Sequence, residues 1–383
     1  MESTGASPRR KLRVGEQIEL RIEKVAHGGH FIGRIDGAVI FIRHGIPGEL
    51  VLVEIESVGK SFSRGNVVQV LEPSRERVTP PCTYAGICGG CDFQHIDIKA
   101  QRKLKSDVIT EQFSRIAKRE LLIDGAPIVV EEISEPLHWR TRTGVNISAK
   151  GEMGYYKSRS HDVVAVSDCP VLVPELEYPE KARKRYEPGT RIELAVANYR
   201  VGSHAFQVSP DSFWQSHKDA PRVLTDAVIA YAEIREGDYV LDLYGGVGLF
   251  TASIADHIGP SGHIELIEGS KSATADAKVN FASDSRIEIR TGDVAKILPR
   301  ISTADVIVLD PPREGAGRDV IVEIGRLKAR RVVYVACDPA ALARDVTYIE
   351  EVGYRMLTMR AFDLFPMTHH IECAAVFEYS EVS

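Results

Sequence analysis

Five short, mainly apolar runs in the C-terminal half of the chain alternate with stretches of helical periodicity. The runs are Val240–Leu243, Ile264–Ile267, Val306–Leu309, Val332–Ala336 and Ala374–Phe377. Runs of this kind are typical of strands that are buried on both faces. Their alternation with helices predicts a mostly parallel sheet covered on both sides. The fold class is therefore α/β, with a Rossmann-like domain over residues 216–383.

The N-terminal segment, residues 13–72, has the pattern of a small all-β domain. Glycine-bearing turns separate alternating runs at Ile18–Ile22, Ala38–Ile42, Leu50–Ile55 and Val67–Leu71. This spacing predicts a five-stranded barrel of the kind that binds oligonucleotides. Such a barrel either holds a nucleic-acid strand or serves only as a packing module, and these residues leave both open.

The central segment, residues 73–215, is expected to be β-rich and to begin with a turn-rich stretch that holds three cysteines. A helix is predicted over residues 99–118, where apolar residues recur at helical spacing. The three cysteines have the spacing Cys-x5-Cys-x2-Cys, which indicates a metal site, and Cys169 is the remaining cysteine outside the C-terminal domain. The three are Cys82, Cys88 and Cys91. Four thiolates suit zinc or an iron–sulfur cluster, and the spacing does not decide between them.

The charge of the chain does not by itself point to nucleic acid. The net charge is −6, whereas nucleic-acid binders usually carry a basic surplus. The charge is uneven, however: residues 1–120 hold 19 basic and 15 acidic residues, a net of +4, which leaves −10 for the remainder. A cation-rich N-terminal part still allows RNA binding.

No apolar run is long enough to predict a membrane span, and the polar, basic N-terminal residues do not resemble a secretory signal. Six unevenly placed cysteines do not predict a disulfide framework. We therefore expect a cytoplasmic protein with no membrane contact and no obligate protein partner, and a monomer by default.

A glycine-rich turn and three strand-end acids indicate a nucleotide-like cofactor. The first strand runs into YGGVGLF, which includes Gly246 and lets a ligand approach the backbone at a helix start. Glu268 ends the second strand, Asp293 follows the third, and Asp310 ends the fourth in LDPPREG. This order is similar to the class I methyltransferase layout, which implies S-adenosylmethionine. Arg313 stands where enzymes that methylate amino groups usually carry an aromatic residue, and this disfavours that reaction.

A cysteine and a glutamate complete a candidate catalytic pair. Cys337 ends the fifth strand, at the sheet edge where ligands of α/β folds bind. Asp338 and Pro339 then open a helix, whose N-terminus is expected to lower the pKa of the thiol. Glu372 begins the last strand, near the cofactor edge, and is the candidate base. Cys373 is expected to point the opposite way, into the core.

Methyl transfer to carbon 5 of uracil is a reaction that needs such a pair. Carbon 5 of uracil is a poor nucleophile until a thiolate adds to carbon 6. A base must afterwards remove the proton from carbon 5 so that the cysteine can leave. The pair therefore predicts nucleophilic catalysis followed by general-base catalysis.

The segments CDPAALARD, LDPPREG and THHIE resemble those of the bacterial RNA (uracil-5-)methyltransferases, a family that modifies 23S ribosomal RNA or transfer RNA. The resemblance covers nearly the whole chain, and residues 13–72 resemble the family's RNA-binding TRAM domain. It implies that Cys337 is the nucleophile and Glu372 the base, and that a [4Fe–4S] cluster is held by Cys82, Cys88, Cys91 and Cys169. The implied contacts to the cofactor and target base are Gln207, Tyr244, Gly246, Glu268, Asp293 and Asp310.

Two departures from the family pattern bear on rate. The family usually reads Ser-Cys-Asn-Pro around the nucleophile, whereas this chain has Asp338 after Cys337. The charge of Asp338 is expected to raise the pKa of the thiol. The family also commonly has Phe two residues before the glutamine, where this chain has Ala205.

The expected reaction is methyl transfer to carbon 5 of a uridine in a loop of 23S ribosomal RNA, with transfer RNA as the alternative. A stacked uridine hides carbon 6, so the target must flip out. Candidate stacking groups are Phe206, Phe213 and Trp214, with core packing expected for at least two of them. The barrel and the basic helix around Lys99–Lys105 are expected to hold flanking RNA.

Two other functions remain to be weighed. A DNA cytosine-5 methyltransferase shares the thiol chemistry, but places its nucleophile after the fourth strand rather than the fifth. A non-catalytic RNA-binding module would not need both Cys337 and Glu372.

Overall fold

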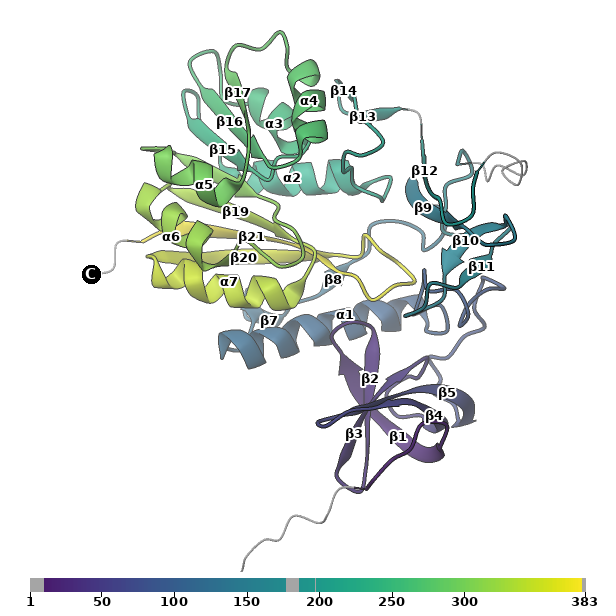
Figure 1. Cartoon of the computed structure of the whole chain (residues 1–383). Helices are drawn as coiled ribbons and strands as arrows, with labels where there is room; N and C mark the ends of the chain where they lie inside the picture. The colour runs from purple at the N-terminus through teal and green to yellow at the C-terminus, as the bar shows by residue number, and fades with distance from the viewer. Residues whose placement is uncertain (1–9, 177–185, 197, 381–383) are drawn as a thin grey trace, which may run out of the picture.

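The computed structural model describes residues 10–176, 186–196 and 198–380. An N-terminal barrel lies at one end and an α/β domain at the other, with smaller sheets beside them (Figure 1). The long helix α1 (Ile98–Gln112) runs between the barrel and the α/β sheet. No helix in the described part of the chain combines the length and the apolar character that a membrane span needs.

The predicted five-stranded barrel is confirmed. Its strands are β1 (Gln17–Ala26), β2 (His30–Ile35), β3 (Ala38–Arg43), β4 (Leu50–Val58) and β5 (Ser63–Glu72). They close in the order β1-β2-β3-β5-β4, and only β3 and β5 pair in parallel. Along β1, Ile18, Leu20 and Ile22 are buried while the residues between them are exposed, as the alternating pattern requires.

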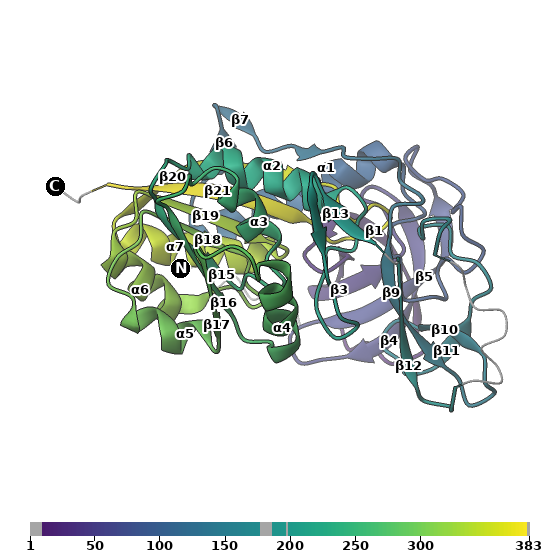
Figure 2. The same cartoon turned by 90° about the horizontal axis from the view of Figure 1, so that it is seen from above.

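The central segment forms small sheets, and the largest of them lies at the end of the molecule opposite the C-terminus (Figure 2). A four-stranded sheet has the order β11-β10-β9-β12, and β13 pairs with β14. The bounds are β6 (Leu122–Ile123), β7 (Ala126–Pro127), β8 (Val130–Glu131), β9 (Arg142–Ile147), β10 (Met153–Tyr156), β11 (Val163–Ala165), β12 (Arg191–Ala195), β13 (Tyr199–Val201) and β14 (His204–Phe206). The predicted helix is also present: Asp97 caps the start of α1, which ends in a π-helical turn, η1 (Phe113–Ala117).

The C-terminal domain is the predicted α/β sheet, with eight strands in the order β17-β16-β15-β18-β19-β21-β20-β8. The first five strands of this order are parallel, and β21 runs antiparallel to both of its neighbours. The strands are β15 (Tyr239–Leu243), β16 (His263–Glu268), β17 (Ile287–Thr291), β18 (Val306–Leu309), β19 (Arg331–Ala336), β20 (Tyr354–Phe362) and β21 (Glu372–Tyr379). The apolar runs do not predict β20, because exposed Arg355 and other partly exposed residues interrupt it.

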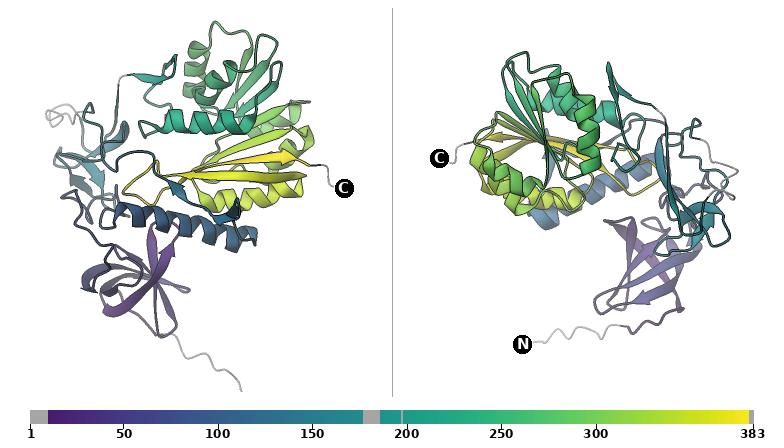
Figure 3. Two further views of the ribbon diagram at one scale, coloured as in Figure 1. Left: turned by 180° about the vertical axis from the view of Figure 1, so that it is seen from behind. Right: turned by 45° about the horizontal axis from the view of Figure 1, so that its top comes forward.

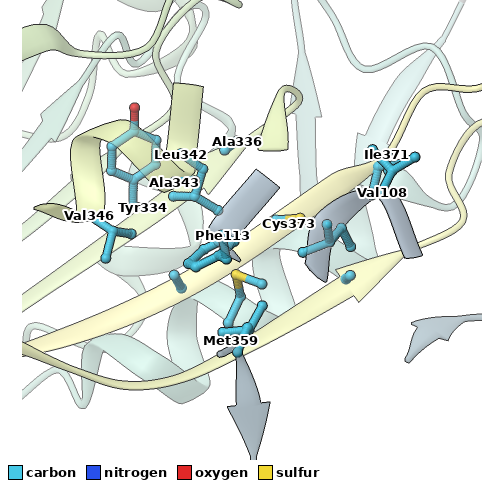
Figure 4. Packing of buried hydrophobic residues seen from close by; sticks show 14 of the residues in the cluster. Val108, Phe113, Tyr334, Ala336, Leu342, Ala343, Val346, Met359, Ile371 and Cys373 are labelled. Atoms are coloured by element: carbon cyan, nitrogen blue, oxygen red, sulfur yellow. The ribbon is translucent and has the colours of Figure 1, made fainter. Parts of the chain in front are cut away.

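Helices cover both faces of this sheet (Figure 3). They are α2 (Ala220–Ala232), α3 (Leu249–Ala255), α4 (Lys271–Asn280), α5 (Val294–Ile297), α6 (Gly317–Leu327) and α7 (Pro339–Glu351), with a 3-10 turn, η3 (Leu298–Arg300). The barrel interior, α1 and one face of the sheet share a continuous apolar cluster. Val108 of α1 and Phe113 of η1 lie with Met359, Ile371 and Cys373 in this cluster (Figure 4). The central segment thus contributes the strand β8 to the sheet of the C-terminal domain and the helix α1 to the apolar cluster on one face of that sheet.

The basic helix differs from the expectation in one respect. Lys105 is buried rather than available to RNA, and its Nζ donates to Asp363 Oδ1 at 2.6 Å and to the carbonyl of Phe365 at 3.0 Å. Helical periodicity places position 105 on the face turned to the core, one residue from Leu104. Lys105 therefore anchors the connection between β20 and β21 to α1. The exposed Lys103 instead pairs with Asp107.

This difference in burial leads to a stability prediction. Replacing Lys105 with alanine leaves the Asp363 carboxylate buried without its cation, which costs about 3 kcal/mol of unfolding free energy. Replacing Lys103 with alanine removes an exposed pair worth less than about 1 kcal/mol and is the matched control. Urea unfolding measures both variants. Equal midpoints for the two would contradict the anchoring role.

Candidate active site

The direction of β21 decides which side chains meet at the cofactor edge of the sheet. Because β21 is antiparallel to β19, its first residues lie beside the last residues of β19, and Cys373 pairs with Ala336. Glu372 and Cys337, each one residue further out, therefore lie at the same edge. The sheet brings the two predicted catalytic residues together, although 34 positions separate them in sequence. Cys373 is fully buried, as predicted.

The thiol of Cys337 is not activated in the way the sequence predicted. Burial, followed by the nearby carboxylates of Glu372 and Asp310, raises the pKa of Cys337 to about 12. The expected lowering by the helix N-terminus is wrong, because Asp338 Oδ1 accepts the hydrogen bonds of the Ala340 and Ala341 N–H groups. The charge of Asp338 adds to the rise, as the sequence predicted.

The surroundings of Glu372 also change the pKa of its carboxyl group. Burial and the neighbouring Asp310 raise its pKa well above the usual value, and the guanidinium of Arg313 acts in the opposite direction. Arg313 also favours the thiolate of Cys337. It is thus the cation of the catalytic pair, a role that the sequence analysis missed. The signal was present, since Arg313 follows the two prolines at the end of the fourth parallel strand.

A cavity of about 140 Å³ opens over the thiol. The barrel closes one side of it with the turn between β1 and β2, and the α/β domain supplies Arg313, Cys337 and the segment from His369 to Ile371. The cavity therefore lies between the barrel and the α/β domain, and a base that is flipped out of its stack could enter it there.

The glycine-rich turn and Glu268 form a second part of the site. Gly246 has a φ of +57°, and its N–H donates to Glu268 Oε2 at 3.1 Å. Glu268 Oε1 accepts from the N–H of Ser270. A Cβ on Gly245 would lie 2.7 Å from Leu266, so this position needs glycine. The turn and the end of β16 are thus held together with the Glu268 carboxylate at the edge.

Three carboxylates gather here without a basic partner. Burial raises the pKa of Asp310 to about 7, and the charges of Asp242 and Glu268 add to the rise. Burial likewise raises the pKa of Asp242 to about 6, where hydrogen bonds from Thr251 act in the opposite direction. No ion pair involves any of these three carboxylates within the described residues, and Asp242 Oδ1 has no hydrogen-bond partner there. A cationic ligand such as S-adenosylmethionine fits this edge, because it would balance the negative charge.

The remaining predicted cofactor contacts lie around the same edge. Tyr244 has a φ of +61° and follows β15 directly. Asp293 caps α5 by accepting from the N–H of Ala295, and its carboxylate is half exposed. Gln207 is tied to α4, because its N–H donates to Asn280 and its amide donates to Asp276. Asn280 also donates to the carbonyl of Val247, so Gln207 is linked to the glycine-rich turn.

Two of the three candidate stacking residues belong to the core, as expected. Phe206 and Trp214 are buried and lie 5.0 Å apart between ring centroids. Phe213 is 66% exposed and remains available to a base. Gln215 donates to Asp310 Oδ2 at 3.4 Å, a contact that the sequence pattern did not indicate.

The four cysteines of the predicted metal site come together. All four are free thiols, and they line one small cavity of about 30 Å³: Cys82, Cys88, Cys91 and Cys169. Burial raises the pKa of Cys91 to about 12, and the neighbouring thiols contribute. Position 89, between Cys88 and Cys91, needs glycine. The N–H of Gly89 donates to the carbonyl of Tyr156 at 2.9 Å, and an added Cβ would lie 2.8 Å from that oxygen.

The spacing of the sulfur atoms bears on the metal. Four thiolates about 2.3 Å from one zinc ion lie about 3.8 Å from one another. No three of the four sulfur atoms form a group within 4.8 Å, although all four lie in the described part of the chain. Four thiolates around one zinc ion would therefore have to lie closer together than these sulfur atoms do.

Comparison with known proteins agrees with this architecture. The TRAM domain family matches residues 11–68, and the tRNA (Uracil-5-)-methyltransferase family matches residues 293–379. An uncharacterized RNA methyltransferase of Streptomyces avermitilis is 39% identical over 95% of this chain and 99% of its own length. Another from Corynebacterium glutamicum is 32% identical over 96% of this chain and 98% of its own.

A solved structure shares the fold over almost the whole chain. It is the tRNA (uracil-54, C5)-methyltransferase of Pyrococcus abyssi in complex with S-adenosyl-L-homocysteine. The likeness has a TM-score of 0.68 and covers 94% of this chain and 99% of that one, with 19% identity.

Proposed function

This chain belongs to the RNA (uracil-5-)methyltransferase family, and from that premise we propose that it methylates carbon 5 of a uridine in 23S ribosomal RNA with Cys337 as nucleophile. The observation that carries the proposal is the meeting of Cys337 and Glu372 at one sheet edge, beside an uncompensated group of carboxylates. Such a pair is needed for carbon 5 of uracil and has no use in methylating an exocyclic amino group.

S-adenosylmethionine, when bound, supplies the methyl group as a sulfonium electrophile, and Asp242, Glu268 and Asp310 are the residues that would balance its positive charge. Cys337 gives up its proton to solvent water before it attacks, and the charge of Arg313 favours the thiolate. The sulfur of Cys337 adds to carbon 6 of the ring, and the electrons of the carbon 5–carbon 6 double bond move into an enolate. Carbon 5 of this enolate then forms the new bond to the methyl group, whose bond to the sulfonium sulfur would break and leave S-adenosylhomocysteine.

Glu372 completes the reaction. Its carboxylate accepts the proton on carbon 5, the carbon 5–carbon 6 double bond re-forms, and the bond to sulfur breaks to return the Cys337 thiolate. A base with a raised pKa is suited to this task, because it holds the abstracted proton more readily. Burial of Glu372 and its nearness to Asp310 supply that rise.

RNA as substrate agrees with the TRAM domain and with the cavity between the barrel and Cys337. The barrel then holds RNA that flanks the flipped uridine, and exposed Phe213 is the remaining stacking candidate. Transfer RNA is the second candidate substrate, favoured by the fold shared with a transfer RNA enzyme. The division into barrel, residues 73–215 and residues 216–383 follows these roles, and RNA as substrate implies a cytoplasmic enzyme.

We also propose that the four central cysteines hold a [4Fe–4S] cluster rather than zinc. The supporting observation is that all four cysteines line one cavity while no three of their sulfur atoms lie within 4.8 Å of one another, so that one zinc ion would need them to move closer. Cys91 is followed by Asp92, which bonds both the N–H and the ring of His369, three residues before Glu372. The cluster therefore orders a loop that supports the catalytic segment, and the reaction needs no redox step.

Nucleoside mass spectrometry of cellular RNA tests the reaction and its target together. Deleting the gene is expected to remove 5-methyluridine from one position of 23S ribosomal RNA, and a plasmid copy of the gene restores it. A copy with Cys337→Ala is expected not to restore it. Loss from transfer RNA instead would select the second substrate. Survival of every 5-methyluridine would overturn the proposed reaction.

A Glu372→Gln variant separates the two chemical steps. Cys337 can still add to uracil, but the proton on carbon 5 is not removed, so the protein–RNA adduct accumulates and survives a denaturing gel. Wild-type methylation is expected to fall as the pH falls, because the raised pKa of Glu372 leaves the base protonated in acid. Glu378→Gln, on the exposed end of the same strand, is the matched control and turns over normally. An adduct that forms equally without Cys337 would contradict the scheme.

Iron and acid-labile sulfide analysis of anaerobically purified protein tests the cluster. The wild type is expected to hold about four iron and four sulfide per chain. Serine at Cys82, Cys88, Cys91 or Cys169 lowers this content, whereas Cys337→Ser abolishes methylation and leaves the iron unchanged. About one zinc per chain, with no sulfide, would replace the cluster with a zinc site.

A further inference from the structure

The turn between β1 and β2 of the barrel contacts the residue that follows the nucleophile. His27 lies 2.9 Å from Asp338, measured between Nε2 and Oδ2. The other oxygen of Asp338 caps α7 through two backbone N–H groups. His27 and Asp338 both line the cavity over the Cys337 thiol. The barrel is therefore joined to the catalytic loop by a side-chain pair that lies 311 positions apart in sequence.

The same turn is fixed in place two residues later. Gly29 has a φ of +75°, and an added Cβ would lie 2.1 Å from Asp92 Oδ2 and 2.8 Å from His369 Nδ1. The backbone of the turn thus packs directly on the pair formed by Asp92 and His369. Held from this side, the turn keeps His27 against Asp338.

The contact between His27 and Asp338 changes the charge that surrounds the Cys337 thiol. Asp338 is one of three carboxylates that raise the pKa of Cys337, after burial. RNA adds further negative charge when it enters the cavity. The hydrogen bond between the two side chains raises the pKa of His27, against burial and the nearby Arg115. That bond, with the backbone N–H bonds of α7, lowers the pKa of Asp338 although burial acts the other way.

We propose that His27 is a positioning residue for the nucleophile, which holds and screens the Asp338 carboxylate so that its charge bears less on the Cys337 thiol. The barrel then does more than bind RNA: its docking sets the reactivity of a thiol in another domain. The role of Cys337 as nucleophile rests on the proposed function, but the effect on the thiol itself does not. Screening by His27 also explains how Asp338 is accommodated beside Cys337.

Alkylation of Cys337 measures this effect without RNA or S-adenosylmethionine. The full-length protein is treated with iodoacetamide at neutral pH, and the modified Cys337 peptide is followed by mass spectrometry. His27→Ala is expected to slow the reaction several-fold, because each unit of rise in thiol pKa lowers the thiolate fraction about tenfold. Asp338→Asn is expected to speed it.

The double variant His27→Ala with Asp338→Asn shows whether His27 screens the charge of Asp338 or only holds the barrel turn in place. Without the carboxylate, loss of His27 no longer matters, so the alkylation rate should return to the wild-type value or above. His27→Gln, which keeps a hydrogen-bond donor but no charge, is expected to lie between the wild type and His27→Ala. A double variant as slow as His27→Ala would overturn the proposal, as would an unchanged rate in His27→Ala.

A matched control uses a pair of the same chemistry at another place. His204 lies 2.8 Å from Asp256, measured between Nε2 and Oδ2, and neither residue lines the Cys337 cavity. His204→Ala is expected to leave the alkylation rate of Cys337 unchanged. Thermal unfolding of each variant identifies any loss of fold. If the wild-type protein methylates no RNA, the proposed function is wrong, whereas the alkylation rates still test the effect of His27 on the Cys337 thiol.

Discussion

The catalytic geometry depends on the reversed direction of β21 between β19 and β20. A parallel last strand would bring its carboxyl end, near Tyr379, to the cofactor edge. The antiparallel strand instead brings its first residue, Glu372, there. Because side chains alternate along a strand, Glu372 faces the site while Cys373 is sealed in the core. One reversal therefore places the proposed base at the cofactor edge and the other thiol in the core.

The site is built with an excess of negative charge, and this governs when it can react. Asp242, Glu268, Asp310 and Glu372 lie close enough that most of them raise the pKa of a neighbour. Arg313 is the cation that acts on both of the proposed catalytic residues, Cys337 and Glu372. In the free protein these charges favour the neutral forms of the Cys337 thiol and of the Glu372 carboxyl group. A positively charged ligand at this edge shifts both groups toward their ionised forms, so cofactor binding and thiol activation are linked by charge.

Polar contacts around α1 hold the central segment against the connection between β20 and β21. The Gln101 side chain donates to the carbonyls of Phe93 and Ile96 and accepts from the N–H of Met367. Lys105 bonds Asp363 in the same connection between β20 and β21. The segment that leads into Glu372 is thus supported by α1 and by the loop that follows the clustered cysteines. Such support from side chains with fixed partners is what a catalytic group needs to keep its position.

The sequence by itself determined the type of most elements, because hydrophobic periodicity reports burial, whereas the partly exposed strand β20 did not follow from its own residues. It also determined the chemical candidates, since Cys337, Glu372 and the four clustered cysteines stand in recognisable local patterns. Tertiary structure alone decided how these groups act. The pKa of Cys337 depends on carboxylates distant in sequence, Lys105 is buried by a strand connection some 250 residues away, and His27 reaches Asp338 only through barrel docking. Electrostatic interaction depends on distance in space, and local sequence patterns do not encode that distance.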